Sequence, residues 1–466
     1  MFLRRAEPHM KYYILLFLFF FINNTYAQNI SAQQAQSDII FLQQALADAH
    51  PGNEFAINNA IRLLHTLQSK ITDSIGIRSF YKEIRYYTTM VNCVHTYTET
   101  IKMDLPPIKP NYFPFDVFID GRKLFLIKQL GDTISNITLP LEVTSINAVP
   151  TAYLIDKMWH YRSSDGNLIT TNNSYTKDYG YFFLAGFLNY PDSFIVTVKN
   201  PDRTFKIASI QSKPVQEVVE LNTLLFEMED CKFYRLNNDT AIYVLDINGF
   251  PDHKYSAFYK SVFNYIESNK VNNLVIDLRD NLGGNRNNLT EFLGYFLDSV
   301  QTYQMTKKTG AAKPYVDKRT YFLQMLKFNV GEFYRCKYEN GYATFTYKIK
   351  PHKYRYEGNL YVLVNGKSAS ASGITAAYLR RYTDAVLIGE ETAGGLNGNN
   401  GGSYCKLILP NSTIQIQFPI FHLSHDFFYD YPYTGVMPDF EITYSAEEII
   451  NYADKEMLLV KKMCQQ

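Results

Sequence analysis

The sequence predicts an α/β fold with a mainly parallel sheet and flanking helices, preceded by an N-terminal helical region and a small β-rich domain. From residue 241 onward, apolar runs alternate with helical patterns, as they do in βαβ units. Residues 28–105 show helical periodicity, and short strands fill residues 110–212. The chain has 466 residues, more than one hydrophobic core usually spans, so several domains are expected.

The first 27 residues have the pattern of a secretory signal peptide. Lys11 precedes the apolar run Tyr12–Ile22, and Thr25–Ala27 forms the exit. The run is too short for a comfortable membrane span. We therefore expect cleavage after Ala27, no stable membrane span afterwards, and an exported protein located in the periplasm or outside the cell.

Three helices are expected in the N-terminal region, at Ser31–Ala49, Ile57–Ser69 and Ser79–Val91. The third helix leads to His95, just before a polar stretch. A single histidine is more often structural than catalytic, so His95 becomes a candidate base only if another group in the protein needs one.

A linker at Pro106-Pro107 precedes residues 110–212, which read as short strands, turns and one helix around Tyr153–Tyr161. Small β-rich domains commonly bind extended peptides by adding a strand. A passive spacer is an equally good interpretation, and the sequence leaves both open.

The α/β core is expected in residues 220–466. Its apolar strand Asn273–Leu278 leads into a glycine turn, and the apolar strand Asn359–Val364 leads into a row of small residues. Sites in such sheets lie at the carboxyl ends of the strands. Between the two strands, residues 301–357 form a basic insertion, which is either a solvated face or a lid that contacts acidic substrates.

Ser368, Ser370 and Ser372 lie where the second of these strands turns into the helical segment Ile374–Tyr382. The unpaired N–H groups at a helix start favour negative charge, so a serine there can be a nucleophile beside its oxyanion donors. Serines also cap helices with no catalytic role, which is common. A phosphate-binding loop is excluded because Tyr361 stands where that motif requires glycine.

Charge and cysteine content exclude several classes of function. The net charge of +1 gives no argument for nucleic acid as a partner. The five cysteines are scattered without a C-x-x-C pair, so a zinc site is not suggested. No metal and no cofactor are expected. Cys93 lies two residues before His95, but this near-adjacency does not favour a Cys-His nucleophile.

Three separated segments resemble the carboxyl-terminal processing peptidases, also called tail-specific proteases. Residues 273–284 resemble their V-I-D-L-R-x-N-x-G-G segment, residues 362–372 their L-V-N-x-x-x-A-S-A-S segment, and residues 435–439 their closing G-[IV]-x-P-D. Residues 141–150 resemble the E-I-x-x-I-N-G-x-P turn of the PDZ-like domain that these proteins carry. The resemblance implies an exported serine endopeptidase that acts on polypeptides, with a PDZ-like domain at 110–212.

By position, the resemblance implies that Ser370 is the nucleophile. The oxyanion hole would then consist of the Ala371 N–H and an N–H from Gly283 or Gly284. A serine needs a base to take its proton, and an imidazole suits this role near neutral pH.

The base is expected to be His95. Many relatives use a lysine, but Gly395 occupies the matching position, which excludes the Ser-Lys branch. His95 instead matches the H-[TA] of the tricorn-like, Ser-His branch. The acid that orients the histidine typically lies shortly before G-[IV]-x-P-D. Pro432 stands where a glutamate would fit, so Asp430 is assigned, with Asp426 behind it.

A second departure is Gly373, which replaces the usual glutamate. These departures leave an alternative open, namely a catalytically inactive relative that binds peptides or apolar ligands. The sequence gives neither the substrate, nor the cleavage preference, nor the oligomeric state.

Overall fold

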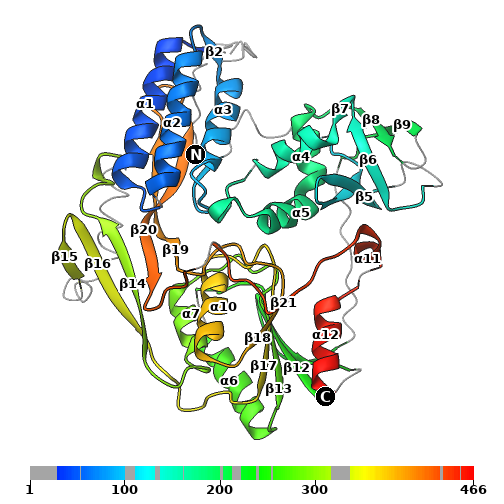
Figure 1. Ribbon diagram of the computed structural model, residues 1–466, viewed down its shortest axis with the longest axis vertical. Helices are drawn as coiled ribbons and strands as arrows, with labels where there is room; N and C mark the ends of the chain where they lie inside the picture. The colour runs from blue at the N-terminus through cyan, green and yellow to red at the C-terminus, as the bar shows by residue number, and fades with distance from the viewer. Residues whose placement is uncertain are drawn as a thin grey trace, which may run out of the picture.

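The computed structural model describes residues 29–465, apart from residues 53, 100–110, 132–136, 161, 200–202, 212–221, 238–240, 253–254, 316–335, 431–433 and 452. The expected signal peptide therefore lies outside the described residues. Among the helices that are described, none has both the length and the apolarity needed to cross a membrane. Figure 1 shows three parts: helices α1–α3 beside the β19–β20 hairpin, a β-rich part with α4 and α5, and a central sheet flanked by helices.

The N-terminal region contains the three expected helices. Its elements are β1 (Asn29–Ile30), α1 (Ala32–Ala49), α2 (Glu54–Lys70), β2 (Ile75–Gly76), α3 (Ile77–Thr89) and β3 (Tyr97–Thr98). α1 begins at a capping box in which Ser31 and Gln34 bond each other's backbone N–H groups. The buried carboxylate of Asp38 accepts the backbone N–H groups of Asn411 and Ser412 at 2.9 and 2.8 Å. These bonds join the start of the chain to its last sixth.

The β-rich part is an antiparallel sheet with two helices. Its elements are β4 (Phe115–Asp120), β5 (Lys123–Gln129), β6 (Leu141–Ile146), β7 (Val149–Pro150), α4 (Thr151–Trp159), η2 (Asp165–Asn167), α5 (Ile169–Phe187), β8 (Ser193–Val198) and β9 (Arg203–Ala208). The strand order is β4-β5-β6-β8-β9, with β7 paired to β6. α5 was not anticipated from the sequence, because its first turns are rich in Thr and Asn, which are poor helix formers.

The central sheet has seven strands and carries helices on both faces. The strands are β10 (Thr223–Met228), β11 (Cys231–Arg235), β12 (Ile242–Ile247), β13 (Asn273–Asp277), β17 (Asn359–Val364), β18 (Val386–Gly389) and β21 (Phe440–Glu441). The helices are α6 (Tyr255–Ser268), α7 (Arg286–Leu293), α10 (Ala371–Tyr382), α11 (Ala446–Ile450) and α12 (Lys455–Cys464). Strands β12, β13, β17, β18 and β21 pair in parallel, whereas β10 and β11 are antiparallel.

The remaining large sheet corrects the prediction of a mainly parallel fold. It is antiparallel, in the order β15-β16-β14-β20-β19, from β14 (Gln301–Lys308), β15 (Cys336–Glu339), β16 (Tyr342–Ile349), β19 (Asn399–Ile408) and β20 (Gln415–His425), with η3 (Lys313–Tyr315) beside it. The sheets taken together are therefore largely antiparallel. The basic insertion supplies three of these strands, and its high charge concealed their alternation of buried and exposed side chains.

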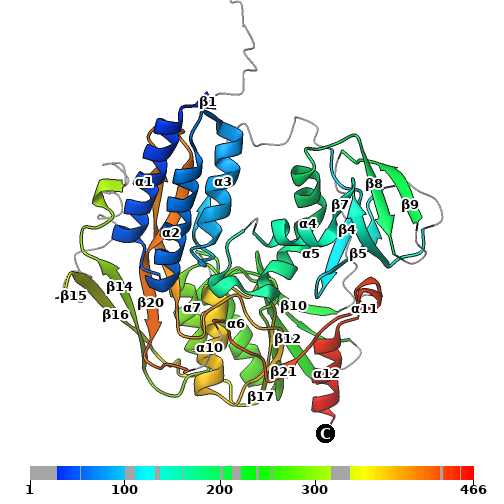
Figure 2. The same ribbon diagram turned by 45° about the horizontal axis from the view of Figure 1, so that its top comes forward.

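Two buried clusters show how the parts are held together. One cluster runs from α1–α3 through the β19–β20 hairpin to the face of the central sheet covered by α6, α7 and α10 (Figure 2). The β-rich part has a cluster of its own, formed by residues between 113 and 207. The N-terminal helices thus share a hydrophobic core with the residues beyond 230.

Candidate active site

Two turns meet at the carboxyl ends of β13 and β17, which are neighbouring parallel strands. We call residues 278–284 the glycine turn and residues 365–370 the serine turn. The Asp280 N–H donates to the Asn365 side-chain oxygen at 3.0 Å, and the Ala369 N–H donates to the Asn281 carbonyl at 2.9 Å. The two turns that the sequence expected at strand ends are therefore directly bonded to each other.

Ser370 lies between the serine turn and the first residue of α10. Its φ of 52° and ψ of −120° fall in a backbone region that non-glycine residues rarely adopt. Such a turn from strand to helix presents a serine hydroxyl away from the sheet, as in the nucleophile elbows of hydrolases. The strain is held in place by the bonds to Asn281 and by the start of α10.

The three serines of this stretch differ in how deeply they are buried. Ser370 is partly exposed, whereas Ser368 and Ser372 are fully buried. The Ser368 hydroxyl donates to the Leu278 carbonyl at 2.7 Å and accepts the Asn365 N–H at 3.0 Å, so it fixes the two turns. The Ser372 hydroxyl is buried and has no hydrogen-bond partner among the described residues. Of the three serines, only Ser370 has any exposure to solvent.

Gly283 is pressed against the serine turn. A Cβ at this position would lie 2.7 Å from the Ser370 Cβ and 2.8 Å from both the Ala369 oxygen and the Ala371 nitrogen. Its φ of 98° also favours glycine. The Gly283 N–H donates to the Asn281 side chain at 2.8 Å. The backbone of the glycine turn thus reaches within contact distance of Ser370 and of the first N–H of α10.

The two departures from the family pattern lie against each other. A Cβ on Gly395 would lie 2.5 Å from the Gly373 carbonyl carbon, and a Cβ on Gly373 would lie 2.4 Å from the Gly394 oxygen. There is no room for a lysine at position 395 or a glutamate at position 373 while these backbones stay in contact. The two glycines are separate departures in the sequence. In the structure both follow from one contact, the close approach of the Gly394-Gly395 backbone to Gly373.

His95 lies in the turn after α3 and faces the start of β19. Its ring is 5.8 Å from that of Tyr404, and a Cβ on Gly401 would be 3.7 Å from the His95 Cε1. Burial, and then the charge of Arg162, lower the pKa of His95 to about 4, although hydrogen bonding with the Asn400 backbone opposes the shift. The imidazole is therefore neutral at neutral pH, as a base must be. Its buried Nδ1 has no hydrogen-bond partner within the described part of the chain.

Asp165 connects the turn of His95 with the loop that packs on α10. Its buried carboxylate accepts the Val94 N–H at 2.8 Å, and a Cβ on Gly394 would lie 2.5 Å from its other oxygen. Burial raises the pKa of Asp165 to about 7, against the hydrogen bond from Val94. A chain of contacts thus leads from Val94 through Asp165 and Gly394 to Gly373, three residues after Ser370.

The two acids assigned from the sequence lie elsewhere. Asp430 is exposed and makes no contact with His95 among the contacts the structure describes. Asp426 accepts the Thr302 N–H at 3.0 Å and the Tyr382 hydroxyl at 3.0 Å, so it serves the far end of α10. The geometry therefore gives Asp426 another role, and the assignment of Asp430 stays a prediction.

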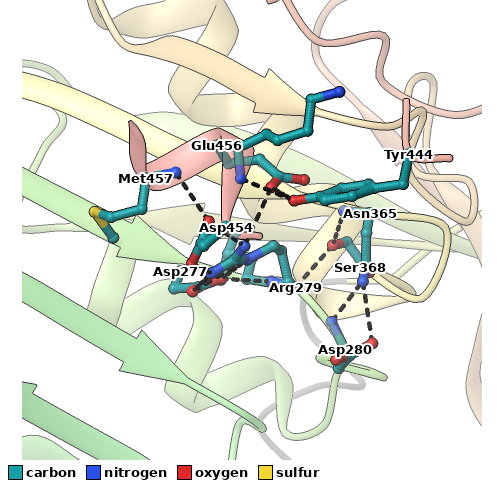
Figure 3. A network of polar contacts seen from close by, with 11 residues as sticks. Asp277, Arg279, Asp280, Asn365, Ser368, Tyr444, Asp454, Glu456 and Met457 are labelled. Atoms are coloured by element: carbon teal, nitrogen blue, oxygen red, sulfur yellow. Dashed lines mark hydrogen bonds and ion pairs between the residues drawn. The ribbon is translucent and has the colours of Figure 1, made fainter. Parts of the chain in front are cut away.

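An ion-pair network connects the glycine turn to the start of α12 (Figure 3). Arg279 makes a bidentate pair with Asp277, with its Nη2 at 2.7 Å, and its Nη1 lies 3.0 Å from Asp454 and 3.4 Å from Glu456. The Tyr444 hydroxyl donates to Glu456. This network attaches the start of α12 to the end of β13.

Lys367 attaches the serine turn to α5 of the β-rich part. Its Nζ bonds Asp178 of α5, and lies 2.9 Å from Asp280 of the glycine turn. Burial lowers the pKa of Lys367, but the charges of Asp280 and Asp178 outweigh this, so the net shift is upward. A Cβ on Gly366 would also meet the Thr170 backbone at 2.2 Å. Lys367 therefore holds its proton and acts as a bridge.

Other nucleophiles and metal sites find no support in the geometry. Burial and the charge of Asp165 raise the pKa of Cys93 to about 12, despite hydrogen bonds that oppose the shift, so its thiol stays protonated. Within the residues described, no group of three or more His, Cys, Asp or Glu side chains could hold a metal ion.

Sequence reasoning missed Asp165, Arg162 and Asn281. Asp165 and Arg162 precede a helix that was itself not anticipated, and no local pattern marks a buried carboxylate between two distant turns. Asn281 lies inside the matched 273–284 segment, so its position was a signal that could have been used. Its side chain donates to the Ile247 carbonyl at 2.7 Å and fixes the glycine turn.

Comparison with protein families gives one match. A model described as peptidase family S41 matches residues 241–442, which include both turns and the closing segment before β21. Among curated proteins, no sequence matches the chain.

Solved structures share the fold over nearly the whole chain. A CPAF mutant aligns with 93% of this chain and 97% of its own, at 13% sequence identity and a TM-score of 0.68. Mature CPAF complexed with lactacystin aligns with 93% of this chain and 98% of its own, at 13% identity and a TM-score of 0.61. At such identity the likeness establishes the fold alone, and it includes the N-terminal helices and the β-rich part.

Proposed function

Because residues 241–442 match peptidase family S41 and the chain is a serine-type peptidase, we propose that it hydrolyses peptide bonds through a Ser-His acyl-enzyme mechanism. Ser370 attacks the scissile carbonyl while His95 takes the hydroxyl proton and later gives it to the leaving amine. The observation that carries the proposal is Ser370 itself, whose backbone is strained at the start of α10 and which is partly exposed where its two neighbouring serines are buried.

The oxyanion of the tetrahedral intermediate would be stabilised by backbone donors beside Ser370. The Ala371 N–H is the first of α10, and the glycine turn supplies the second donor. Since the Gly283 N–H is donated to Asn281, Gly284 is the better of the two glycines predicted for this role. Each such donor contributes roughly 3–4 kcal/mol to transition-state stabilisation in related acyl-transfer sites.

The support for His95 is its neutral state and its position. Asp165 fixes the turn of His95 to the loop that packs on α10. A pKa of about 4 keeps the imidazole unprotonated at neutral pH. In this proposal Asp165 positions the turn through Val94 and does not contact the imidazole. The role of Asp430 as the orienting acid rests on its place in the sequence alone.

The test is covalent labelling by a fluorophosphonate probe together with peptidase assays. Ser370→Ala should abolish both labelling and peptide hydrolysis without a change in thermal unfolding. Ser372→Ala is the matched control, because its buried hydroxyl bonds nothing in the described structure and should be dispensable. Retained activity in Ser370→Ala would refute the assignment, and a wild-type protein that neither labels nor cleaves would favour the inactive ligand-binding relative.

A Ser-Lys mechanism is tested by the nearest lysine before Ser370 in the sequence and the nearest lysine after it. Lys367→Met and Lys406→Met should change turnover modestly, by about tenfold or less, because Lys367 bridges two aspartates and Lys406 pairs with Glu99 on the surface. Complete loss of activity in either folded variant would show that the base is a lysine.

We further propose that the chain is exported, on the strength of residues 1–27 alone. N-terminal sequencing of the mature protein should then start at Gln28. The β-rich part is proposed to be PDZ-like and to bind substrate peptides; its support is the turn at residues 141–150, its antiparallel sheet and its separate buried cluster.

A further inference from the structure

The turn that carries His95 is bonded to three segments of the chain that are distant from it in sequence. We call residues 92–96 the base turn. Hydrogen bonds join it to His50 at the end of α1 and to Asn400 of β19. Ser163 and Asp165, which lie before α5, bond it from the β-rich part. The position of the base turn is therefore set by segments that only the fold brings together.

His50 donates a hydrogen bond to the base turn from a single tautomer. The Gly52 N–H donates to the His50 Nδ1 at 2.9 Å, so Nδ1 carries the lone pair of the ring. The ring proton is then on Nε2, which lies 2.7 Å from the Thr96 hydroxyl oxygen. The ring is buried, with its centroid 5.9 Å from that of Phe418. Burial, and then the charge of Lys308, lower the pKa of His50 to about 3, so the ring stays neutral and keeps this tautomer.

The sulfur of Cys93 is the centre of the hydrogen bonds inside the base turn. Burial raises the pKa of the Cys93 thiol to about 12, whereas hydrogen bonds with the Thr96 hydroxyl and the His95 backbone oppose the shift. Because these two bonds favour the thiolate, both groups donate to the sulfur. The Asn400 side chain donates to it as well, at 3.8 Å. A path of hydrogen bonds thus runs from His50 through Thr96 and Cys93 to the backbone of His95.

The imidazole of His95 depends on this turn for its orientation. In a Ser-His-Asp triad a carboxylate bonds the histidine Nδ1 and holds the ring. The Nδ1 of His95 is buried and has no hydrogen-bond partner among the residues that the structure describes. The ring does form a hydrogen bond with the backbone of Asn400, whose side chain bonds Cys93. The base turn and β19 together therefore set the direction in which the ring points.

From these contacts we propose that His50 is a positioning residue for the proposed base, because it fixes the Thr96 hydroxyl and, through Cys93, the backbone that carries the His95 imidazole. His50 is 1% exposed, so it acts through the turn and touches no substrate. This inference rests on the proposed function, and it adds a residue that neither the sequence pattern nor the proposed mechanism includes.

The first test compares two amide variants of His50. Gln carries its amide nitrogen as many bonds from Cα as His carries Nε2, so His50→Gln keeps the donor for Thr96 and loses the acceptor for Gly52. His50→Asn does the reverse, because its amide oxygen reaches only as far as Nδ1. We expect kcat to fall about tenfold or more in His50→Asn and to stay within about threefold of wild type in His50→Gln, with KM unchanged in both. Equal kcat values in the two variants, or a change confined to KM, overturn the proposal.

The second test removes the hydroxyl that receives the bond from His50. Thr96→Val should lower kcat about as much as His50→Asn, whereas Thr96→Ser keeps the hydroxyl and should stay near wild type. Because both changes break one path, the double variant should lose no more than the worse single variant. Losses that multiply in the double variant overturn the path. Thr176→Val is the matched control, because the Thr176 hydroxyl is equally buried but donates within α5 to the Asn172 carbonyl, so kcat should hold.

Nuclear magnetic resonance separates this inference from the proposed mechanism. In full-length Ser370→Ala protein with isotopically labelled histidine, the ring signals of His95 are identified by their loss in His95→Gln. His50→Asn should shift these signals and move the pKa of His95 upward towards its ordinary value, because the turn loosens and its burial decreases; His50→Gln should not. If the signals are the same in both variants while Ser370→Ala abolishes hydrolysis, the role of His50 is wrong and the mechanism stands. If the signals differ as expected but Ser370→Ala still cleaves, the nucleophile is wrong and the role of His50 in placing His95 stands.

Discussion

Gly283→Ala tests whether the glycine turn packs tightly against Ser370, the proposed nucleophile. The added Cβ would lie 2.7 Å from the Ser370 Cβ and 2.8 Å from the backbone atoms of Ala369 and Ala371. Carbon atoms in good contact are about 3.5–4.0 Å apart, so the serine turn must retreat by roughly 1 Å. A displacement of that size in a catalytic group costs about 100-fold in rate. We therefore expect kcat to fall about 100-fold.

Stability gives a second magnitude. The φ of 98° at Gly283 costs a residue with a Cβ about 1–2 kcal/mol, and overpacking adds about 1–3 kcal/mol. Gly341→Ala is the matched control, because Gly341 has a φ of 79° in the β15–β16 turn with nothing within 4 Å of an added Cβ. Gly341→Ala should therefore lose only the part of the unfolding free energy that comes from the positive φ, and it should keep full activity.

The assay combines peptide hydrolysis with urea denaturation of both variants at a temperature where each is folded. We expect a large difference in kcat between the two variants and a smaller difference in their free energies of unfolding. If Gly283→Ala retains activity within about threefold of Gly341→Ala, the contact between the two turns is wrong as described.

Three further predictions concern the pH dependence of activity, the pH dependence of stability and the ion-pair network. Because burial lowers the pKa of His95 to about 4, kcat/KM should hold as the pH falls from about 7 to about 5 and drop near 4; a drop centred on the ordinary 6.5 would contradict this. The pKa values of His50, His95 and His425 all lie below 6.5 in the fold, at about 3, 4 and 4, through burial. The unfolded chain therefore binds more protons between about pH 6.5 and 4, and urea denaturation should show their contribution to stability lost as the pH falls through this window. Arg279→Met leaves the carboxylates of Asp277 and Glu456 without their cation, at side-chain exposures of 12% and 4%, and should cost about 3–5 kcal/mol of unfolding free energy. Arg355→Met, whose partner Glu357 is 76% exposed, should cost less than about 1 kcal/mol; equal costs would contradict the network.

The parts of the fold that the sequence predicted are those with strong local signals. β13 and β17 are apolar runs buried along nearly their whole length, and the serine turn follows from the small residues after β17. The three N-terminal helices follow from their apolar spacing. The family resemblance then indicated that these pieces form a serine peptidase, and the family match confirms it.

The parts that escaped prediction depend on tertiary contacts. β14 buries Tyr303 and Met305 at alternate positions, but the lysines in and after it made the segment look like a charged surface insertion and not a strand. Asp165 gains its surroundings from the turn after α3 and from the 392–395 loop, both far away in sequence. Arg162 lies over the ring of Tyr175 on α5, a helix that was not anticipated. In the sequence, the absence of a lysine at position 395 and of a glutamate at position 373 are two separate departures from the family pattern, because only the structure shows Gly373 and Gly395 in contact.

The bonds from Asp38 to Asn411 and Ser412 join residues 373 and 374 positions apart. During synthesis, α1 leaves the ribosome long before its partners exist, and the buried carboxylate cannot be satisfied until the β19–β20 hairpin has been made. His95 packs against β19, the first strand of this hairpin. Ser370 precedes the hairpin in the chain. If Ser370 and His95 act together as proposed, a nascent chain that stops short of residue 411 therefore lacks the complete hairpin against which the base packs, and the order of translation itself delays proteolysis until the polypeptide is almost finished.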